Sequence, residues 1–573
     1  MTASDTSGPW ARPAAGREPA GAALLGWLVD PAAPRLCLVT GDKGCGKSQL
    51  LAWLVAHGTR PGTAPERRVH GFAPLDGQGV RTAIWTLADQ LGVAARAPGE
   101  LLAELAADRR RTVLVLPDLH AASDPQALTD LIGALVGLDH LKVVVEARAG
   151  HDVMPVLKGL TPAEMNLDDP RWTDPARAEA WRAEHPARQE PALPDPAETE
   201  APDLLDLDDP VALCAADPER VTAAYEADTD PREGLRPAWL RAGQSLLRAQ
   251  QPADRALVLL ANLGDGADPR LAPALEECAA DTPWRLVWSR IRGDVTPPWP
   301  GPALALAAGR RTLEGHALVA DHQGTLRAVS LADAAPAGRM PDLVPDPHGL
   351  AALPDGTVIV LDGEGRLHTH RAPAAPRPSG LAALLDDGPG AWQQAMDALS
   401  LAVTHARITA LAASEQALAV ADSTGRVHLA FLAAPDRVLP PEHLHEGPVT
   451  ALTVTDVPIG EPGQSVGLVY SGGVDGRVRA WGVGNEPLDV PVAERPCPVR
   501  ALAAELTTSG LTLAIAWADG LVEHQRLDTH ERRTFHPGPP VTALALTRTE
   551  ELLIGTDESL TCLRPISPTV EGP

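Results

Sequence analysis

The chain has 573 residues, a formal net charge of -26 at pH 7, and six cysteines with no C-x-x-C pair. This length predicts three or four folding units, and the negative charge argues against nucleic acid or an anionic membrane surface as the main partner. The sequence has no apolar run of membrane-spanning length and no basic-then-apolar leader. We therefore expect a cytoplasmic protein with reduced thiols and no membrane partner.

The strongest motif follows the first predicted strand. We expect residues 1–15 to be disordered and residues 22–28 to form a short helix. The apolar run at 36–40 predicts a buried strand, and residues 41–48, GDKGCGKS, then match the G-x-x-x-x-G-K-[ST] spacing ahead of a helix predicted over 48–57. Strand, loop and helix in this order are the setting of a phosphate-binding loop. The alternative is a glycine-rich turn without a ligand.

Each residue type in this loop suits phosphate chemistry. The glycines allow backbone amides to curl around phosphate oxygens, the lysine reaches the β- and γ-phosphates, and the serine hydroxyl is a ligand for Mg²⁺. The motif therefore predicts ATP or ADP with Mg²⁺ as the cofactor, and Ser48 as the metal ligand from the loop. The predicted nucleotide-binding residues are Gly41, Gly44, Gly46, Lys47, Ser48 and Gln49.

The remaining elements of the N-terminal third alternate between strand and helix. Strands are predicted at 67–72, 112–116 and 141–145, and helices at 80–91 and 126–138. This alternation is typical of right-handed crossovers, which build a parallel sheet with a ligand site at its carboxyl edge. Acidic residues that hold the Mg²⁺ water shell and the attacking water are expected where the strand at 112–116 ends.

Residues from about 16 to 169 resemble the ATPase module of STAND-type signalling NTPases, which are relatives of AAA+ proteins. The resemblance rests on Gly16-Arg17-Glu18, the loop, PDLHAAS at 117–123, which is similar to the family's D-D-L-H-W-A-D, and a strand followed by Arg148, similar to the family's T-S-R sensor. It implies an α/β P-loop NTPase domain over 16–185, with Arg148 at the nucleotide.

The resemblance implies two alternatives for the acidic residues. Either Pro117 occupies the position of the family's metal-site Asp and Asp118 is the second acid, beside the attacking water, or the register shifts by one and Asp118 serves the Mg²⁺. Asp118 is thus the candidate catalytic residue and a candidate metal ligand, and one acid is missing in both cases. This favours nucleotide binding over turnover. The structural alternatives are a turn cap for Asp118 and a surface arginine for Arg148.

The middle of the chain changes composition. Residues 186–210 are predicted to be an acidic, proline-rich linker, because Lys and Arg are missing from 189 to 219 and little apolar surface can be buried there. The alternative is docking on arginines of a neighbour. Residues 211–283 are predicted to form a small helical domain, which by the resemblance closes over bound nucleotide. Its predicted helices span 217–225, 237–249, 253–263 and 269–280.

Residues 284–571 contain a repeat. An apolar strand, a turn that begins with Asp, and an alternating strand recur at intervals of 38 to 60 residues, and three intervals lie near the roughly 40–45 residues of a propeller blade. The turn residues are Asp321, Asp362, Asp422, Asp475, Asp519 and Asp557. The units resemble WD repeats, with DGRVRAW at 475–481 as the clearest case. They predict an all-β propeller rather than a β-sandwich.

The propeller is predicted to have six or seven blades. Residues 284–291 can supply a strand, and 372–405 is either a degenerate blade or a helical excursion. We expect the turn aspartates to be structural, because Asp in a tight turn bonds its own backbone. The histidine pairs 368/370 and 443/445 have the spacing of a conceivable metal site, but without a third ligand we expect solvated strand residues. No Ser/His/Asp or Cys/His constellation is predicted.

Three functional hypotheses follow from this multidomain reading. The first is a STAND-type switch, in which nucleotide binding is coupled to a protein partner held by the propeller, with an effector supplied in trans and nucleotide-dependent homo-oligomers. The effector is expected in trans because only about twenty residues precede the ATPase module. The second is a propeller scaffold that binds nucleotide without hydrolysis. The third is a motor or kinase-like enzyme, for which no substrate site is visible. Slow ATPase activity is compatible with the first.

Overall fold

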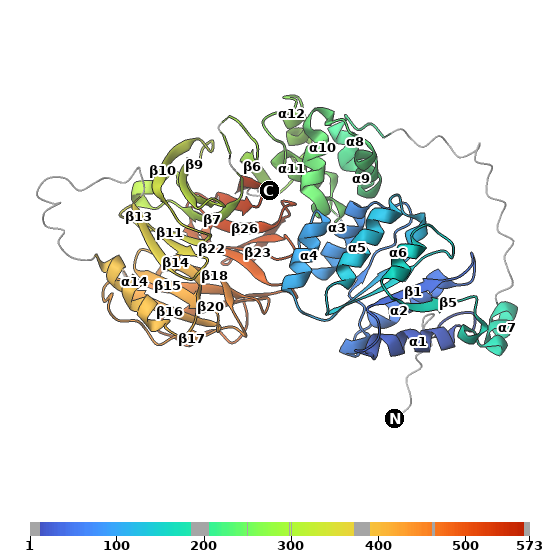
Figure 1. The fold of residues 1–573 in the computed structure, drawn as a ribbon. Coiled ribbons are helices and arrows are strands. Elements are labelled where there is room, and N and C mark those ends of the chain that lie inside the picture. Colours follow the sequence, from blue (N-terminus) through green and yellow to red (C-terminus); the bar gives the residue numbers. More distant parts are fainter. Residues whose placement is uncertain are drawn as a thin grey trace, which may run out of the picture. The chain divides into compact units, whose positions relative to one another are not determined.

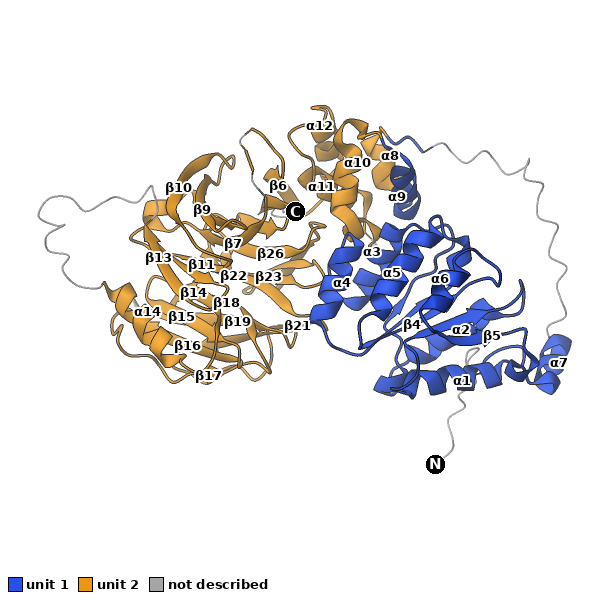
Figure 2. Cartoon of the chain, viewed as in Figure 1, with its two compact units in different colours: residues 1–207, 216–229 blue, residues 208–215, 230–573 orange. Residues whose placement is uncertain are grey.

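The computed structural model groups the chain into two compact units (Figures 1 and 2). The first unit comprises residues 1–207 and 216–229, and the second comprises 208–215 and 230–573. The structure describes residues 12–184, 205–248, 250–296, 298–299, 301–371, 390–460 and 464–566.

Three sequence predictions lie wholly or largely outside the described residues. They concern the N-terminus before residue 12, most of the linker at 186–210, and the first part of the segment at 372–405. The predicted domain boundaries stay predictions. Within the described ranges, none of the helices combines the length and hydrophobicity that a bilayer-spanning segment needs.

The first unit contains a five-stranded parallel sheet in the order β2-β3-β4-β1-β5. Its central strands are short apolar runs whose side chains are buried on both faces, as expected of a parallel sheet covered by helices. The parallel α/β sheet predicted from the sequence is confirmed. The strands are β1 (Leu36–Thr40), β2 (Gly71–Phe72), β3 (Thr112–Leu116), β4 (Leu141–Glu146) and β5 (Ala163–Asn166).

Helices of this unit follow the apolar periodicity. Leu24, Leu51 and Leu54 from two of them pack against Val39 and Val113 of the sheet. The helices are α1 (Glu18–Val29), α2 (Lys47–Gly58), α3 (Val80–Leu91), α4 (Pro98–Ala107), α5 (Pro125–Val136), α6 (Met154–Gly159), α7 (Pro175–Glu184) and α9 (Pro218–Ala227).

Two predicted elements differ in extent. The strand predicted at 67–72 is reduced to the two residues of β2, because Pro65 begins a short 3₁₀ turn and Arg67 and Arg68 remain exposed. Helix α1 begins at Glu18 rather than at 22, since Pro19 suits a first helical turn although Ala and Gly there give no apolar periodicity.

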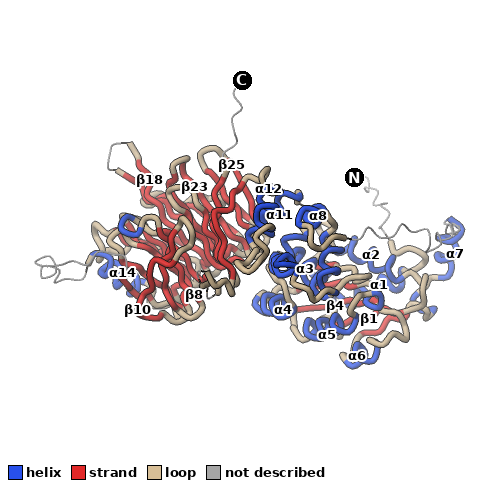
Figure 3. Tube along the Cα trace, turned by 90° about the horizontal axis from the view of Figure 1, so that it is seen from above, coloured by secondary structure: helices blue, strands red, loops and turns tan. Residues whose placement is uncertain are grey.

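The second unit contains a six-bladed β-propeller (Figure 3). Each of the six repeats predicted from the sequence forms the hairpin between the second and third strands of one blade. Blades 1 to 3 consist of β7 (Ala303–Ala308), β8 (His316–Asp321), β9 (Thr325–Ser330) and β10 (Pro336–Leu343); β11 (Pro347–Ala352), β12 (Thr357–Asp362) and β13 (Leu367–Arg371); and β14 (Ile408–Ala413), β15 (Ala417–Asp422), β16 (Arg426–Phe431) and β17 (Glu442–His443).

Blades 4 to 6 complete the ring. They consist of β18 (Val449–Pro458), β19 (Ser465–Gly473), β20 (Arg477–Gly482) and β21 (Ala493–Glu494); β22 (Val499–Thr507), β23 (Gly510–Trp517), β24 (Val522–Arg526) and β25 (Glu531–Phe535); and β26 (Val541–Leu546), β27 (Leu552–Thr556), β28 (Ser559–Pro565) and β6 (Trp284–Ile291).

Strand β6 closes the propeller. It pairs antiparallel with β28, so the first and last strands of the propeller sequence lie in the same blade. Trp288 of β6 donates a hydrogen bond from its indole Nε1 to the Leu331 carbonyl at 2.7 Å, which ties the closing strand to blade 1. The prediction that 284–291 supplies a strand is confirmed. In the described residues it completes a sixth blade and not a seventh.

The innermost strands carry small side chains. Alanines such as Ala351, Ala412 and Ala503 face a narrow central channel, which leaves a cavity of about 90 Å³. Alanine side chains fit the narrow space where the six innermost strands converge. The abundance of alanine in these runs therefore has a packing reason.

Blade 2 has three strands in the described residues, and helix α14 (Ala391–Ala402) lies beside it. Met396 and Leu399 of this helix are buried against Ile359 and Leu418, which belong to blades 2 and 3. Figure 1 shows α14 next to β15 and β16. Of the two alternatives for 372–405, the described part therefore supports the helical excursion.

A group of helices is built onto the propeller within the second unit. Ser245 Oγ donates to the His536 carbonyl at 3.0 Å, and Asn262 Nδ2 donates to the Pro537 carbonyl at 2.8 Å. Arg241 pairs with Glu558 at 3.2 Å. These bonds tie the helices and blades into one body. The helices are α8 (Pro210–Ala215), α10 (Leu235–Ala242), α11 (Pro252–Ala261) and α12 (Leu271–Cys278).

Candidate functional site

The glycine-rich loop of the first unit connects β1, an interior strand, to α2. Gly41, Gly44 and Gly46 have φ values of 145°, 83° and 92°, in the left-handed region that favours glycine. A Cβ at Gly41 would lie 2.6 Å from the Cys45 Sγ, which is too close for any side chain. The loop therefore needs glycine at these positions for backbone conformations that other residues rarely adopt, and at Gly41 also for the space that the Cys45 side chain occupies.

Lys47 lies inside this loop. It is the first residue of α2, is 7% exposed, and its Nζ donates to the carbonyls of Gly41 and Asp42, both at 3.0 Å. Ser48 and Gln49 follow on the first turn of the helix and are exposed. The predicted loop residues are thus brought together around one ammonium group at the N-terminus of a helix.

Glu146 is a carboxylate of this site to which the sequence analysis assigned no role. It ends β4, whose neighbour in the sheet is β1, and it stands in register with Val39. Its oxygens lie 3.4 and 3.5 Å from Ser48 Oγ and 3.9 Å from Lys47 Nζ, and the residue is 2% exposed. The available signal was an acidic residue at the end of a buried apolar run.

The surroundings of Glu146 disfavour its charged form. Burial is the main cause that raises its pKa from 4.5 to about 7, and the nearby Asp118 carboxylate acts in the same direction. Lys47 and the hydrogen bond from Ser48 oppose this shift without cancelling it. Glu146 is therefore harder to ionise than an exposed glutamate.

The end of β3 has an unusual backbone. Pro117 is buried, and Asp118 has φ 59°, a left-handed conformation that is uncommon for a residue other than glycine. Arg148 is exposed, two residues beyond β4. The charges of both side chains act on the pKa of His120. Its pKa is lowered mainly by burial and then by Arg148, while Asp118 opposes the shift. The predicted roles of Asp118 and Arg148 stay predictions.

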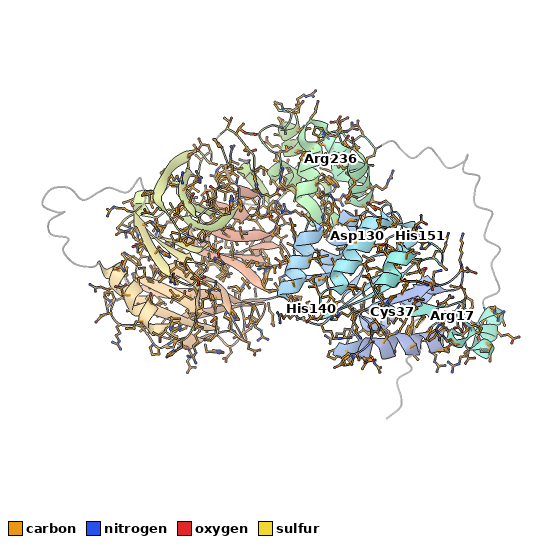
Figure 4. All side chains as sticks on the ribbon, viewed as in Figure 1. Arg17, Cys37, Asp130, His140, His151 and Arg236 are labelled. Carbon is orange, nitrogen blue, oxygen red and sulfur yellow. The ribbon has the colours of Figure 1, made fainter. Side chains whose placement is uncertain are left out.

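Arg17 holds the loop from outside and is labelled in Figure 4. Its guanidinium donates to the Cys45 carbonyl in the loop, to the Leu167 carbonyl at 2.8 Å and to Thr173 Oγ1 at 2.6 Å. The Asp168 carboxylate accepts the backbone N–H of Asp42 at 3.0 Å. Arg17 of the Gly16-Arg17-Glu18 segment therefore has a structural role in fixing the loop.

The turn aspartates of the first three blades are structural, as the sequence predicts. In the first three blades each one accepts the backbone N–H groups two and four residues ahead. Each also pairs with a basic side chain six residues ahead. These pairs are Asp321 with Arg327, Asp362 with His368 and Asp422 with His428, at 3.3, 2.7 and 3.0 Å.

Ser471, His445 and Asp475 form a hydrogen-bonded row in blade 4. His445 Nδ1 lies 3.0 Å from Asp475 Oδ1, and its Nε2 lies 2.8 Å from Ser471 Oγ. The prediction that His445 is a solvated strand residue is wrong, because it is 2% exposed and bridges two side chains distant in sequence. Ser471 is fully buried. The row therefore stabilises the blade and has no access to a substrate.

The other histidine pair also lacks a metal-site arrangement. His368 is bonded to Asp362, and the pKa of His370 is lowered mainly by burial. Across the part of the chain that the structure describes, no group of three or more His, Cys, Asp or Glu side chains is arranged to hold a metal ion.

No protein-family model and no curated protein matches the chain. Among solved structures, a crystal structure of the computationally designed Ika8 protein is similar over 46% of this chain and 71% of that chain, at 17% sequence identity and a TM-score of 0.27. A likeness at this level carries no argument about function. The function must be argued from the residues of the chain itself.

Proposed function

We propose that the first unit binds Mg²⁺ with ATP or ADP through the loop at 41–48. The observation that carries this proposal is the position of Lys47, whose ammonium lies inside a loop made tight by three left-handed glycines, between a buried parallel strand and the start of a helix. Backbone N–H groups and the positive end of α2 add to its attraction for phosphate. The STAND resemblance supports the same reading.

The residues present fit a Mg²⁺ ion. Magnesium prefers hard oxygen ligands, and Ser48, Glu146 and Asp118 provide a hydroxyl and two carboxylates beside the loop. When bound, the ion would neutralise negative charge on the phosphates and orient them. The residues that would hold the nucleotide are Gly41, Gly44, Gly46, Lys47, Ser48 and Gln49, together with Arg148.

The whole chain is then a nucleotide-dependent switch with a protein-binding scaffold. A β-propeller is generally a protein-interaction module, and here helices α10 and α11 are bonded to it within one body. A partner held by the blades would act on these helices directly. We propose that the partner and the nucleotide bias the same conformational equilibrium, that an effector acts in trans, and that assembly into homo-oligomers depends on nucleotide.

A second candidate is a scaffold that binds nucleotide without productive turnover. The observation that favours it is the end of β3, where buried Pro117 is followed by one acid, Asp118, in a left-handed conformation. Efficient hydrolysis needs an acid for the metal and another for the attacking water. A turnover measurement with radiolabelled ATP, with and without captured partner protein, separates a stimulated slow ATPase from a scaffold that only binds.

Nucleotide binding is tested with a pair of lysine variants. Lys47→Ala removes the ammonium inside the loop, whereas Lys43→Ala removes an exposed lysine of the same loop. We expect Lys47→Ala to weaken binding of fluorescent ATP and ADP analogues by roughly 10- to 100-fold, the worth of one charged hydrogen bond to phosphate. Lys43→Ala should bind like the wild type. Equal affinities of Lys47→Ala and wild type, or no binding by either, would contradict the proposal.

A further inference from the structure

We propose that Glu146 is the carboxylate partner of the Mg²⁺ site, a role that β4 fills because β3 lacks its first acid. The inference rests on the proposed function, since it concerns the ion that accompanies the nucleotide. Glu146 would act as a positioning residue, which holds the metal or its water beside Ser48. The residue itself does not touch the reacting phosphate.

Strand order places this carboxylate where the ion needs it. Strand β4 lies between β3 and β1, so its carboxyl end is next to the loop, whereas β3 is one strand further away. Adjacent oxygen ligands of an octahedral Mg²⁺ lie about 3 Å apart. Both oxygens of Glu146 are 3.4 to 3.5 Å from Ser48 Oγ, so a small movement lets hydroxyl and carboxylate serve one ion.

The present partners of Glu146 leave its charge poorly compensated. Among the described residues, the donors that face its oxygens are Ser48 Oγ, at long distances, and Lys47 Nζ at 3.9 Å. A buried carboxylate normally needs close donors or a cation. Glu146 is 2% exposed and has neither at close range.

Glu146 is not needed to anchor Lys47. The ammonium of Lys47 donates to two backbone carbonyls at 3.0 Å, and Glu146 lies beyond hydrogen-bond distance from it. A nucleotide would bring further negative charge to a site that already holds Glu146 and Asp118. A divalent cation between these carboxylates and the phosphates resolves this repulsion.

The test measures how much Mg²⁺ strengthens nucleotide binding. Full-length wild type, Glu146→Gln and Glu146→Asp are titrated with a fluorescent ATP analogue in EDTA and at increasing Mg²⁺. Glu164→Gln on β5 is the matched control, because its side chain is 55% exposed and pairs with Lys158. We expect Mg²⁺ to strengthen binding by the wild type and the control alike.

In Glu146→Gln this Mg²⁺ effect should fall by about 10- to 100-fold, the usual range for a supporting ligand of a metal site. Affinity in EDTA should be unchanged or improved, and Glu146→Asp should recover part of the Mg²⁺ effect. A merely structural role would lower affinity in EDTA and Mg²⁺ equally, which overturns the inference.

Other outcomes separate this inference from the proposed function. A full Mg²⁺ effect in Glu146→Gln, or loss of the effect only in Asp118→Asn, overturns the role of Glu146 while nucleotide binding stands. A wild type that binds nucleotide without any Mg²⁺ effect also overturns it. If the wild type binds no nucleotide in EDTA or Mg²⁺, the proposed function itself falls.

Discussion

Acid should destabilise the part of the propeller next to its closing strand, through His524. This residue lies in β24, is 4% exposed, and meets the Trp284 ring of β6 edge-on, with ring centroids 5.3 Å apart. Its pKa is lowered from 6.5 to about 4, mainly by burial and then by Arg533, with Arg526 acting in the same direction and Glu550 opposing. Among the described residues its Nε2 has no hydrogen-bond partner. An added proton there would gain no acceptor.

The direction of the effect follows from proton binding. The folded protein keeps His524 neutral down to about pH 4, whereas the unfolded chain takes up a proton near pH 6.5. The unfolded state therefore binds more protons between these values, and the free energy of unfolding falls as the pH falls. The shift corresponds to about 3 kcal/mol when titration is complete, and to about 2 kcal/mol at roughly pH 5.

The assay compares His524→Gln with the wild type. Urea unfolding is followed by tryptophan fluorescence at about pH 7.5 and pH 5, and the loss of unfolding free energy between the two is recorded. We expect the loss in His524→Gln to be about 2 kcal/mol smaller than in the wild type. His322→Gln, an exposed turn histidine of blade 1, should behave like the wild type. His536, whose pKa burial lowers to about 3, contributes equally to the loss in both proteins, so the difference between them reports on His524 alone. Equal losses in His524→Gln and wild type would refute the reasoning.

Three further predictions concern other parts of the chain. In EDTA without nucleotide, Glu146→Gln should raise the free energy of unfolding at about pH 8 by roughly 1–3 kcal/mol. The reason is that the unfolded chain ionises this acid near pH 4.5 and the folded protein only near pH 7, so the ionised carboxylate destabilises the folded wild type at pH 8; an unchanged urea midpoint contradicts this. Trp288→Ala in the closing strand should cost about 3–5 kcal/mol and lower the urea midpoint of the propeller, whereas a midpoint within error of the wild type would show that β6 is not needed for closure. Ser471 should not react with a fluorophosphonate probe in the folded protein, since it is fully buried beside His445, and labelling detected by mass spectrometry would reopen a catalytic role.

The propeller could be predicted because its signals are local. Each repeat combines a period of two with an Asp turn, and both belong to a single hairpin, so all six hairpins were found from the sequence. The number of blades was left open because it depends on a long-range pairing. Strand β6 joins β28 across the whole propeller sequence, and no local pattern specifies that partner.

Whether a single polar side chain is buried or exposed was harder to predict than the fold. His445 lies in a polar stretch that resembles a solvated strand, yet its partners are 26 and 30 residues away in the chain. Burial of a polar residue is decided by such partners, because a hydrogen-bonded imidazole can be buried where an unpaired one cannot. Neither the spacing of the two histidines nor the local composition contains this information.

The acid beside the glycine-rich loop is also decided by a long-range contact that the sequence does not show. The sequence indicates the loop itself, since its glycines, Lys47 and Ser48 are consecutive. The family resemblance predicts an acid at the end of β3, where this sequence has Pro117. In the folded sheet, however, β4 lies between β3 and β1. An acid at the end of β4 therefore reaches Ser48 more directly than one on β3, so Pro117 alone does not show that the site lacks a second carboxylate.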